Sequence, residues 1–327
     1  MNKKVGIIGL GKYLPEKCLT NKDLEKMVDT TDEWIVGRTG IRERRIARED
    51  EATSDMAVIA AKRAIEDAKL TPEQIDLIIV ATITPDMFFP STACVVQSKL
   101  GINRIPAFDI SVACSGFIYG IAIANQFIKS GVYKHILMIA AEKMSSVTDW
   151  TDRSTCVLMG DGAGAAVLGE VEEGGILSIH LGADGSKGNL LQMPAGGSKT
   201  PATASTVEKR MHFLKMEGNI LFKHAVRVMA EAALKATESL GLKGDDINLV
   251  IPHQANIRIL NAVAKRMGID PKKKLYLNID KYGNMSAASS AVALTEAVKE
   301  GRVKKGDIIL LDAFGAGLTW GAIVIKW

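Results

Sequence analysis

The 327-residue sequence has little of what marks several common protein classes. Its four cysteines are scattered without a Cys-x-x-Cys pair, which suits neither a zinc site nor a disulfide framework and fits a reducing cytoplasm. No apolar run approaches the length of a membrane span, and the short apolar start ending in Gly-Lys reads as a first strand, not a signal peptide. A net charge of +4 is too weak by itself to indicate a nucleic-acid partner.

What the sequence does contain is an internal repeat. AKRAIEDAKLTPEQIDLIIV (61–80) aligns without a gap with ALKATESLGLKGDDINLVIP (233–252), and each reads as an amphipathic helix, a turn and an apolar strand. Further pairs follow in the same order: 108–131 with 278–301, 135–141 with 307–313, and 162–170 with 315–326. Chance similarity of two generic strand–helix units is the alternative, but the shared order favours duplication.

The repeat also predicts an architecture. Strands that read as continuous apolar runs between helices are typical of buried, largely parallel sheets. We therefore expect an α/β protein of two halves, 1–171 and 172–327, packed face to face in five layers, α/β/α/β/α.

Cys114 stands where the first half changes from strand to helix. In FDISVACSGF (108–117), a β-type run meets the cysteine and then opens a helix predicted to reach about Lys129. Free N–H groups at a helix start favour an anion, so we expect a lowered pKa for this thiol. The alternative is a structural role, in which the buried cysteine serves as a small apolar group. In the repeat, Cys114 aligns with Asn284, so both are expected to begin a helix.

Two further polar residues follow predicted strands. In VIPHQAN (250–256), His253 comes just after a strand, where open α/β sheets place their ligand chemistry, and the other four histidines lie in apolar or surface-like contexts. In DKYGNMSAAS (280–289), Asn284 comes after the predicted strand LYLNI and a Tyr-Gly turn. Asn284 alone is more often a helix cap than a catalyst, so the three residues carry weight as a set.

Seven motifs carry a family resemblance over the whole chain: TDEWIVGRTGIRERR (31–45), FPSTAC (89–94), FDISVACSGF, MGDGAGAAVLG (159–169), PHQAN, YGNMSAASS and LLDAFGAGLTWGA. In this order they resemble β-ketoacyl-acyl-carrier-protein synthase III, the condensing enzymes that start bacterial fatty-acid synthesis within the thiolase-like superfamily. The resemblance implies a thiolase-like fold and a Cys114–His253–Asn284 triad. It implies an acyl-CoA and malonyl-acyl carrier protein as substrates, a cytoplasmic homodimer, and no cofactor or metal.

The implied chemistry suits these residue types. A Claisen condensation between thioesters needs a nucleophile that is also a good leaving group, and a cysteine thiolate is both. Loss of carbon dioxide from malonyl leaves an enolate, to which His253 and Asn284 can donate hydrogen bonds. The backbone N–H groups of Cys114 and Ala316 are expected to hold the acyl oxyanion. The commonest family form has glycine where Ala316 stands, and alanine would be strained if that position required a positive φ.

The resemblance also implies contacts to the substrates. The expected CoA-binding residues are Thr30, Trp34, Arg38, Arg153 and Asn256, with the adenine beside Trp34 and Arg153. The expected acyl-pocket residues are Phe89 and Phe314, and aromatic walls favour short primers. Because acyl carrier protein is acidic, a basic docking patch is expected at Lys223, Arg258, Lys265 and Arg266. From the residues alone, Trp34 is better explained as part of a helix core and the 151–153 segment as a solvated loop, and the basic residues are equally well explained as a solvated helix face.

Other functions stay open beside this one. A thiolase proper would be expected to carry a second cysteine near its C-terminal Gly-rich turn, whereas Cys156 is the last cysteine here. Other candidates are a hydroxymethylglutaryl-CoA synthase type, a papain-type Cys–His–Asn hydrolase and a non-catalytic heterodimer partner. The nearest alternative is a related acyltransferase of secondary metabolism that uses a different primer or acceptor.

Overall fold

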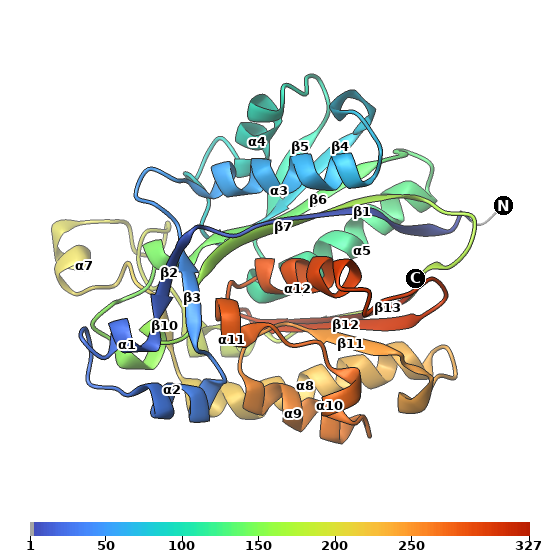
Figure 1. The fold of residues 1–327 in the computed structure, drawn as a ribbon. Helices are drawn as coiled ribbons and strands as arrows, with labels where there is room; N and C mark the ends of the chain where they lie inside the picture. The colour runs from blue at the N-terminus through green and yellow to red at the C-terminus, as the bar shows by residue number, and fades with distance from the viewer. Residues whose placement is uncertain (1–2) are drawn as a thin grey trace.

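The computed structural model describes residues 3–327 and contains two mixed β-sheets stacked one above the other (Figure 1). In the upper sheet the antiparallel pairs β1–β7 and β7–β6 are followed by the parallel pairs β6–β4 and β4–β5. Its strands are β1 (Val5–Tyr13), β7 (Asp161–Glu170), β6 (Ile136–Lys143), β4 (Leu77–Ala81) and β5 (Ala107–Ile110).

The lower sheet repeats this arrangement with four strands. Its order is β8–β13–β12–β11, and it has the same pattern, two antiparallel pairs followed by a parallel one. Its strands are β8 (Gly175–Ala183), β13 (Thr319–Lys326), β12 (Ile308–Gly315) and β11 (Leu249–Pro252). The aligned strands β4 and β11, β6 and β12, and β7 and β13 thus occupy equivalent positions in the two sheets, which confirms the duplication. β5 has no counterpart, because the segment aligned with it enters a helix at Ile279.

Helices complete the five layers predicted from the repeat. α3 (Thr53–Asp67) packs on the outer face of the upper sheet, with α4 (Thr92–Leu100) beside it. α5 (Gly116–Lys129) and α12 (Ala288–Lys299) lie between the sheets, and α8 (Gly218–Glu238) packs on the outer face of the lower sheet with α9 (Ile257–Arg266) against it (Figure 1). α12 is buried almost all round, because a helix between two sheets presents no face to water.

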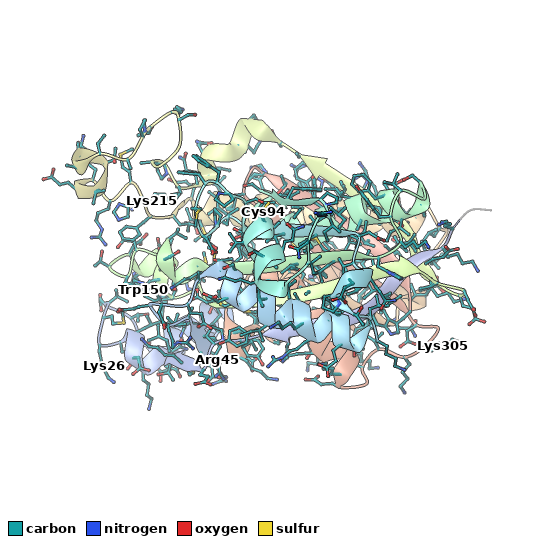
Figure 2. All side chains as sticks on the ribbon, turned by 90° about the horizontal axis from the view of Figure 1, so that it is seen from above. Lys26, Arg45, Cys94, Trp150, Lys215 and Lys305 are labelled. Carbon is teal, nitrogen blue, oxygen red and sulfur yellow. The ribbon has the colours of Figure 1, made fainter. Side chains whose placement is uncertain are left out.

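Shorter elements lie at one end of the molecule and at its edges. They are β2 (Lys17–Thr20), α1 (Asn21–Leu24), α2 (Asp32–Thr39), β3 (Glu43–Ile46), α6 (Arg153–Cys156), β9 (Leu191–Gln192), α7 (Ala204–Glu208), β10 (Lys215–Met216), α10 (Pro271–Lys274) and α11 (Ile279–Tyr282). Figure 2 places Lys215 and Trp150 at the end that carries α7, and Lys305 at the opposite end, where Figure 1 shows both chain termini.

Two expectations about local structure need correction. LYLNI (275–279) is not a strand: Leu275 makes one isolated bridge to Val250, and the chain then enters α11. Asn284 does not begin a helix, because α12 starts four residues later, at Ala288. In the part of the chain that the structure describes, no helix is long and apolar enough to cross a membrane.

Candidate active site

Cys114, His253 and Asn284 line one cavity of about 890 Å³. Cys114 comes from the 3₁₀ turn η2 (Ala113–Ser115) before α5, His253 from the end of β11, and Asn284 from the loop before α12. The duplicated fold therefore brings residues from both halves together, although 139 positions separate the cysteine from the histidine (253 minus 114). The three side chains thus line the same cavity, as the sequence predicted.

A hydrogen bond and the close approach of β12 fix the turn that carries Cys114. Ala113 adopts a left-handed φ of 44°, an uncommon conformation for a residue with a side chain. The Ser115 hydroxyl donates to the Thr319 carbonyl oxygen (3.1 Å). A Cβ added at Gly315 would lie 2.7 Å from the Cys114 backbone nitrogen, so only glycine lets β12 approach the nucleophile turn this closely.

His253 is buried and neutral. Its backbone N–H donates to the Asp312 carbonyl oxygen (2.7 Å), and its Nδ1 has no hydrogen-bond partner among the described residues. Burial lowers the pKa of His253 to about 3, so the ring is uncharged at neutral pH. With no acceptor near Nδ1, the favoured tautomer carries its hydrogen on Nε2, where it can be donated into the cavity.

Asn284 is oriented by its own loop. Its side-chain Oδ1 accepts from the Ser286 N–H (2.9 Å), which leaves the side-chain NH₂ as a donor. The preceding Gly283 has φ of 63°, and a Cβ there would lie 2.6 Å from the Leu158 carbonyl oxygen. The Asn284 backbone in turn bonds to Leu158 and Gly160 (2.8 and 3.0 Å). This fixed loop, not a helix start, sets the direction of the amide.

The thiol pKa differs from the sequence-based expectation. Burial raises the pKa of Cys114 to about 12 in the resting site, with a further increase from the nearby Glu142 and an opposing contribution from the Ser286 hydroxyl. The predicted lowering at a helix start is therefore wrong for the resting site, because the loss of water around the sulfur has the larger effect. Deprotonation of this sulfur needs a proton acceptor.

The turn around Ala316 lies beside Cys114 and lines the cavity. Ala316 does not have a positive φ; the unusual backbone angle falls on the next residue, Gly317, at 138°. Alanine is thus accommodated without strain where the commonest family form has glycine. Among the described residues no backbone carbonyl group accepts a hydrogen bond from the Ala316 N–H, which leaves this N–H free to act as an oxyanion donor.

Three of the five expected CoA-binding residues line the cavity, and Arg153 lies against the Trp34 ring without lining the cavity itself. Trp34, Arg38 and Asn256 line it, and the guanidinium carbons of Arg153 and Arg38 lie 4.9 and 5.7 Å from the centre of the Trp34 ring. Arg153 itself is held by the Asp29 carbonyl oxygen (2.7 Å).

Trp34 combines the two alternatives left open by the sequence. It packs partly against the small core of α1 and α2, and it also presents its ring to the arginines. Asn256 caps α9 and donates to the Arg38 carbonyl oxygen (3.1 Å). Thr30 does not line the cavity, and its hydroxyl is buried without a partner.

The two expected acyl-pocket residues are placed differently. Phe314 is buried and lines the cavity, together with apolar side chains such as Leu158 and Leu214. Phe89 is 85% exposed and does not line this chain's own cavity. Its neighbours Met87 and Phe88 are exposed as well. The expectation that Phe89 lines the pocket is therefore not met within one chain.

The expected docking residues are all exposed, but only two reach the cavity. Lys223 on α8 and Arg258 on α9 line it, and the Arg258 guanidinium carbon lies 5.6 Å from the Phe222 ring centre. Lys265 and Arg266 lie near the far end of α9 and do not line it. Arg258 and Lys265 share one helix face, as their spacing of seven predicts.

Two residues of the site gave no signal in the sequence. Ser286 lines the cavity next to the Cys114 thiol, and Glu142 lies buried behind it at the end of β6. Glu142 follows the apolar run 135–141 directly and was not singled out. Among residues 3–327, no group of three or more potential metal-ligating side chains comes together.

Comparisons with known proteins bear on the family of the chain. Models for 3-oxoacyl-[acyl-carrier-protein] synthase III match residues 108–185, and for its C-terminal part residues 237–327. A β-ketoacyl-[acyl-carrier-protein] synthase III of Caldanaerobacter subterraneus is 61% identical, over 98% of this chain and 97% of that protein. The crystal structure of the corresponding synthase from Aquifex aeolicus superposes with a TM-score of 0.91 at 52% identity, covering 99% of this chain and 100% of that one.

A more distant structure bears on the nearest alternative. The priming β-ketosynthase of the R1128 polyketide pathway superposes with a TM-score of 0.92, covering 99% of this chain and 97% of that one, but is only 36% identical. Its sequence identity to this chain is lower than that of the Caldanaerobacter and Aquifex synthases III, and about equal to the 37% of the synthase III from Pseudomonas aeruginosa. The chain is an acyltransferase with a thiolase-like fold, and it belongs to the β-ketoacyl-acyl-carrier-protein synthase III family.

Proposed function

We propose that this chain condenses a short acyl-CoA primer with malonyl-acyl carrier protein, releasing carbon dioxide and giving a 3-ketoacyl-acyl carrier protein, as the first step of fatty-acid synthesis. The observation that carries the proposal is the shared cavity of Cys114, His253 and Asn284. A thiol nucleophile and two neutral donors suit acyl transfer followed by enolate stabilisation.

In the first half-reaction, Cys114 attacks the acyl-CoA thioester and retains the acyl group, and CoA leaves. The N–H groups of Cys114 and Ala316 hold the oxyanion of the tetrahedral intermediate, since both belong to backbone that lines the cavity. CoA departs before the carrier protein enters, because both substrates bring the same phosphopantetheine arm into one cavity. The reaction is therefore ping-pong.

In the second half-reaction, malonyl loses carbon dioxide and its enolate attacks acyl-Cys114. Negative charge develops on the thioester oxygen, and the Nε2–H of His253 and the NH₂ of Asn284 donate to it. A neutral imidazole is the form required. It can donate its Nε2–H to the enolate oxygen, and it does not have to lose a proton in each catalytic cycle.

Trp34 offers a test of the CoA site. We expect Trp34→Ala to raise the KM for acetyl-CoA by about tenfold, because stacking of a base on an aromatic ring is worth about 1–3 kcal/mol. The reaction of acetylated enzyme with malonyl-acyl carrier protein should not change, since that substrate carries no adenine. Trp150→Ala is the matched control: this tryptophan is half-buried but lines a different pocket. Equal KM values for wild type and Trp34→Ala would contradict the assignment.

Several further features are part of the proposal. The docking patch for the acidic carrier protein is formed by Lys223, Arg258, Lys265 and Arg266, and Lys223 and Arg258 lie nearest the cavity.

We also propose that two chains form a homodimer. The exposed Phe89 lines the partner's acyl pocket, which reconciles its exposure with its expected role. The halves are 1–171 and 172–327, because the strands of the two sheets divide there. The free thiols fit a cytoplasmic location.

The proposed function is tested by mass spectrometry of the intact protein. Incubation with acetyl-CoA should add one acetyl group at Cys114, and malonyl-acyl carrier protein, but not water, should discharge it as acetoacetyl-acyl carrier protein. Rapid hydrolysis of the adduct would instead indicate a hydrolase, and no adduct with any short acyl-CoA would indicate a non-catalytic role. Discharge only by a different acceptor would favour the secondary-metabolism alternative.

A further inference from the structure

A buried carboxylate group lies behind the two enolate donors and has no role in the scheme above. Glu296 is on α12, is 6% exposed and does not line the cavity. Its Oε1 accepts hydrogen bonds from the Tyr282 hydroxyl (2.7 Å) and from the Lys12 ammonium of β1. Its Oε2 accepts from the Asn278 side-chain NH₂ (2.9 Å) and, at longer range, from the Tyr276 hydroxyl (3.4 Å). One carboxylate thus holds β1, α11 and the segment before α11 against α12.

One branch of these hydrogen bonds leads to Asn284. Tyr282 is the last residue of α11, and only Gly283 separates it from Asn284. The bond from Tyr282 to Glu296 fixes the end of α11 on α12, and the Lys12 ammonium lies 5.8 Å from the centre of the Tyr282 ring. The point from which the Asn284 loop departs is therefore set by the carboxylate.

The other branch leads to His253 through Gln254, which is fully buried. The Gln254 side-chain NH₂ donates to the carbonyl oxygens of Pro252 (2.8 Å) and Tyr276 (3.2 Å). The Gln254 Oε1 accepts from the Asn278 N–H (3.1 Å). Pro252 and Gln254 flank His253 in the chain, so these hydrogen bonds fix the backbone on both sides of the imidazole.

We propose that Glu296 is a positioning residue that sets His253 and Asn284 at the spacing at which both can donate to one enolate oxygen. Its carboxylate holds the His253 loop through Asn278 and the Asn284 loop through Tyr282. We name the donor-positioning network by its members, Glu296, Asn278, Tyr282 and Gln254. This inference deepens the proposed function and rests on the proposed role of the two donors.

The charge of Glu296 strengthens the network. Burial by itself raises the pKa of this carboxyl group, but hydrogen bonds from Asn278, Lys12 and Tyr282 outweigh burial and hold the pKa below its usual value. The group is therefore ionised at neutral pH. Hydrogen bonds to an ionised acceptor are about twice as strong as those between neutral groups. A neutral amide in this place would hold the same donors less firmly, and it would offer them only one acceptor oxygen.

The two donors depend on such support because little else orients them. The His253 Nδ1 has no hydrogen-bond partner among the described residues, so the direction of the ring follows the backbone that carries it. The Asn284 amide is oriented by its own loop, and that loop begins directly after α11. A displacement of about 1 Å at a reacting group can cost about a hundredfold in rate, even when the mutation lies away from the chemistry.

The test compares the two half-reactions of Glu296→Gln in single turnovers, followed by mass spectrometry of the intact protein. Acetylation of Cys114 by acetyl-CoA should keep the wild-type rate, because that step uses backbone donors. Discharge of the acetylated variant by malonyl-acyl carrier protein should slow by about tenfold to a hundredfold. The loss should fall on the maximum rate and not on the KM for the carrier protein, because no residue of the network lines the cavity.

Tyr282→Phe separates the two branches. It removes the hydroxyl that bonds to Glu296 and leaves the branch to His253 intact. Discharge should slow by about tenfold, again without a change in acetylation. The double variant of Tyr282→Phe and Glu296→Gln should be no slower than Glu296→Gln alone, because both changes act through one hydrogen-bond network. A full additional loss in the double variant would contradict a shared network.

Glu51→Gln is the matched control. Glu51 is also a buried carboxylate that accepts from a tyrosine hydroxyl (Tyr13, 2.6 Å), but it lies two residues before α3 and does not line the cavity. It should leave both half-reactions at the wild-type rate. Discharge of Glu296→Gln at the wild-type rate, or an equal loss in both half-reactions, would overturn the positioning role. A wild-type protein that forms no acetyl-Cys114, or whose adduct malonyl-acyl carrier protein does not discharge, would instead overturn the proposed function.

Discussion

Replacement of Cys114 by alanine is expected to abolish the acetyl adduct and to lower condensation by about 10⁴-fold or more, as loss of a covalent nucleophile does in other acyl-transfer enzymes. Cys114→Ser should be affected almost as severely, because a buried hydroxyl is harder to deprotonate than a thiol. The measurement is the rate of 3-ketoacyl product formed from acetyl-CoA and malonyl-acyl carrier protein, beside the mass of the protein.

The matched control is Cys156→Ser, which alters a fully buried cysteine that does not line the cavity. It should form the acetyl adduct normally, whatever it does to stability. Cys114→Ala should still decarboxylate malonyl-acyl carrier protein slowly, since His253 and Asn284 are intact and need no acyl-enzyme to hold an enolate. Full condensing activity in Cys114→Ala would remove the nucleophile from the mechanism altogether.

The order of elements and the place of Cys114 could be predicted because local sequence encodes them. Apolar runs of strand length, amphipathic helices and Gly-rich turns recur in the same order, and each pairing seen in the lower sheet has a counterpart in the upper one. The cysteine follows β5 and precedes α5 directly in the chain. The position of Cys114 between a strand and a helix can therefore be predicted from the local sequence, without knowledge of the tertiary structure.

What the sequence could not give depends on distant parts of the chain. Asn284 forms an isolated β-bridge with Met159, a residue of the other half. This pairing keeps Asn284 out of the helix, which begins only at Ala288. The direction of the Cys114 pKa shift depends on how much water is removed when the second half closes over the turn. The surroundings of Glu142 could not be predicted either, because they form only when the turn at Thr82–Thr84 is brought to it.

The exposed segment at Met87–Phe89 illustrates a different limit. Family resemblance predicted that Phe89 belongs to an acyl pocket, but a single chain leaves it in solvent. In the proposed homodimer Phe89 acts across the interface, and such a residue looks, in its own chain, like any apolar surface residue. Neither periodicity nor burial in one chain can distinguish the two.

The two enolate donors give the second large effect. Asn284→Asp keeps the shape and the oxygen that accepts from the Ser286 N–H, but it replaces the donor amide by a group that repels or fails to donate to the enolate. We expect it, and His253→Ala, to lower decarboxylation and condensation by about 10²–10³-fold, the usual effect of removing one donor to a developing oxyanion. Acetylation of Cys114 should survive, because that step uses backbone donors.

The pH dependence of the second half-reaction sharpens this prediction. Because burial depresses the His253 pKa to about 3, the ring is neutral at every pH above that value, and the rate at which acetylated enzyme consumes malonyl-acyl carrier protein should show no histidine inflection between about pH 5 and about pH 8. His180→Gln, at a half-buried histidine outside the cavity, is the matched control and should leave both half-reactions unchanged. A loss of the second half-reaction on acidification through about pH 6.5, absent in His253→Gln, would show that the imidazole titrates normally and that burial does not keep it neutral.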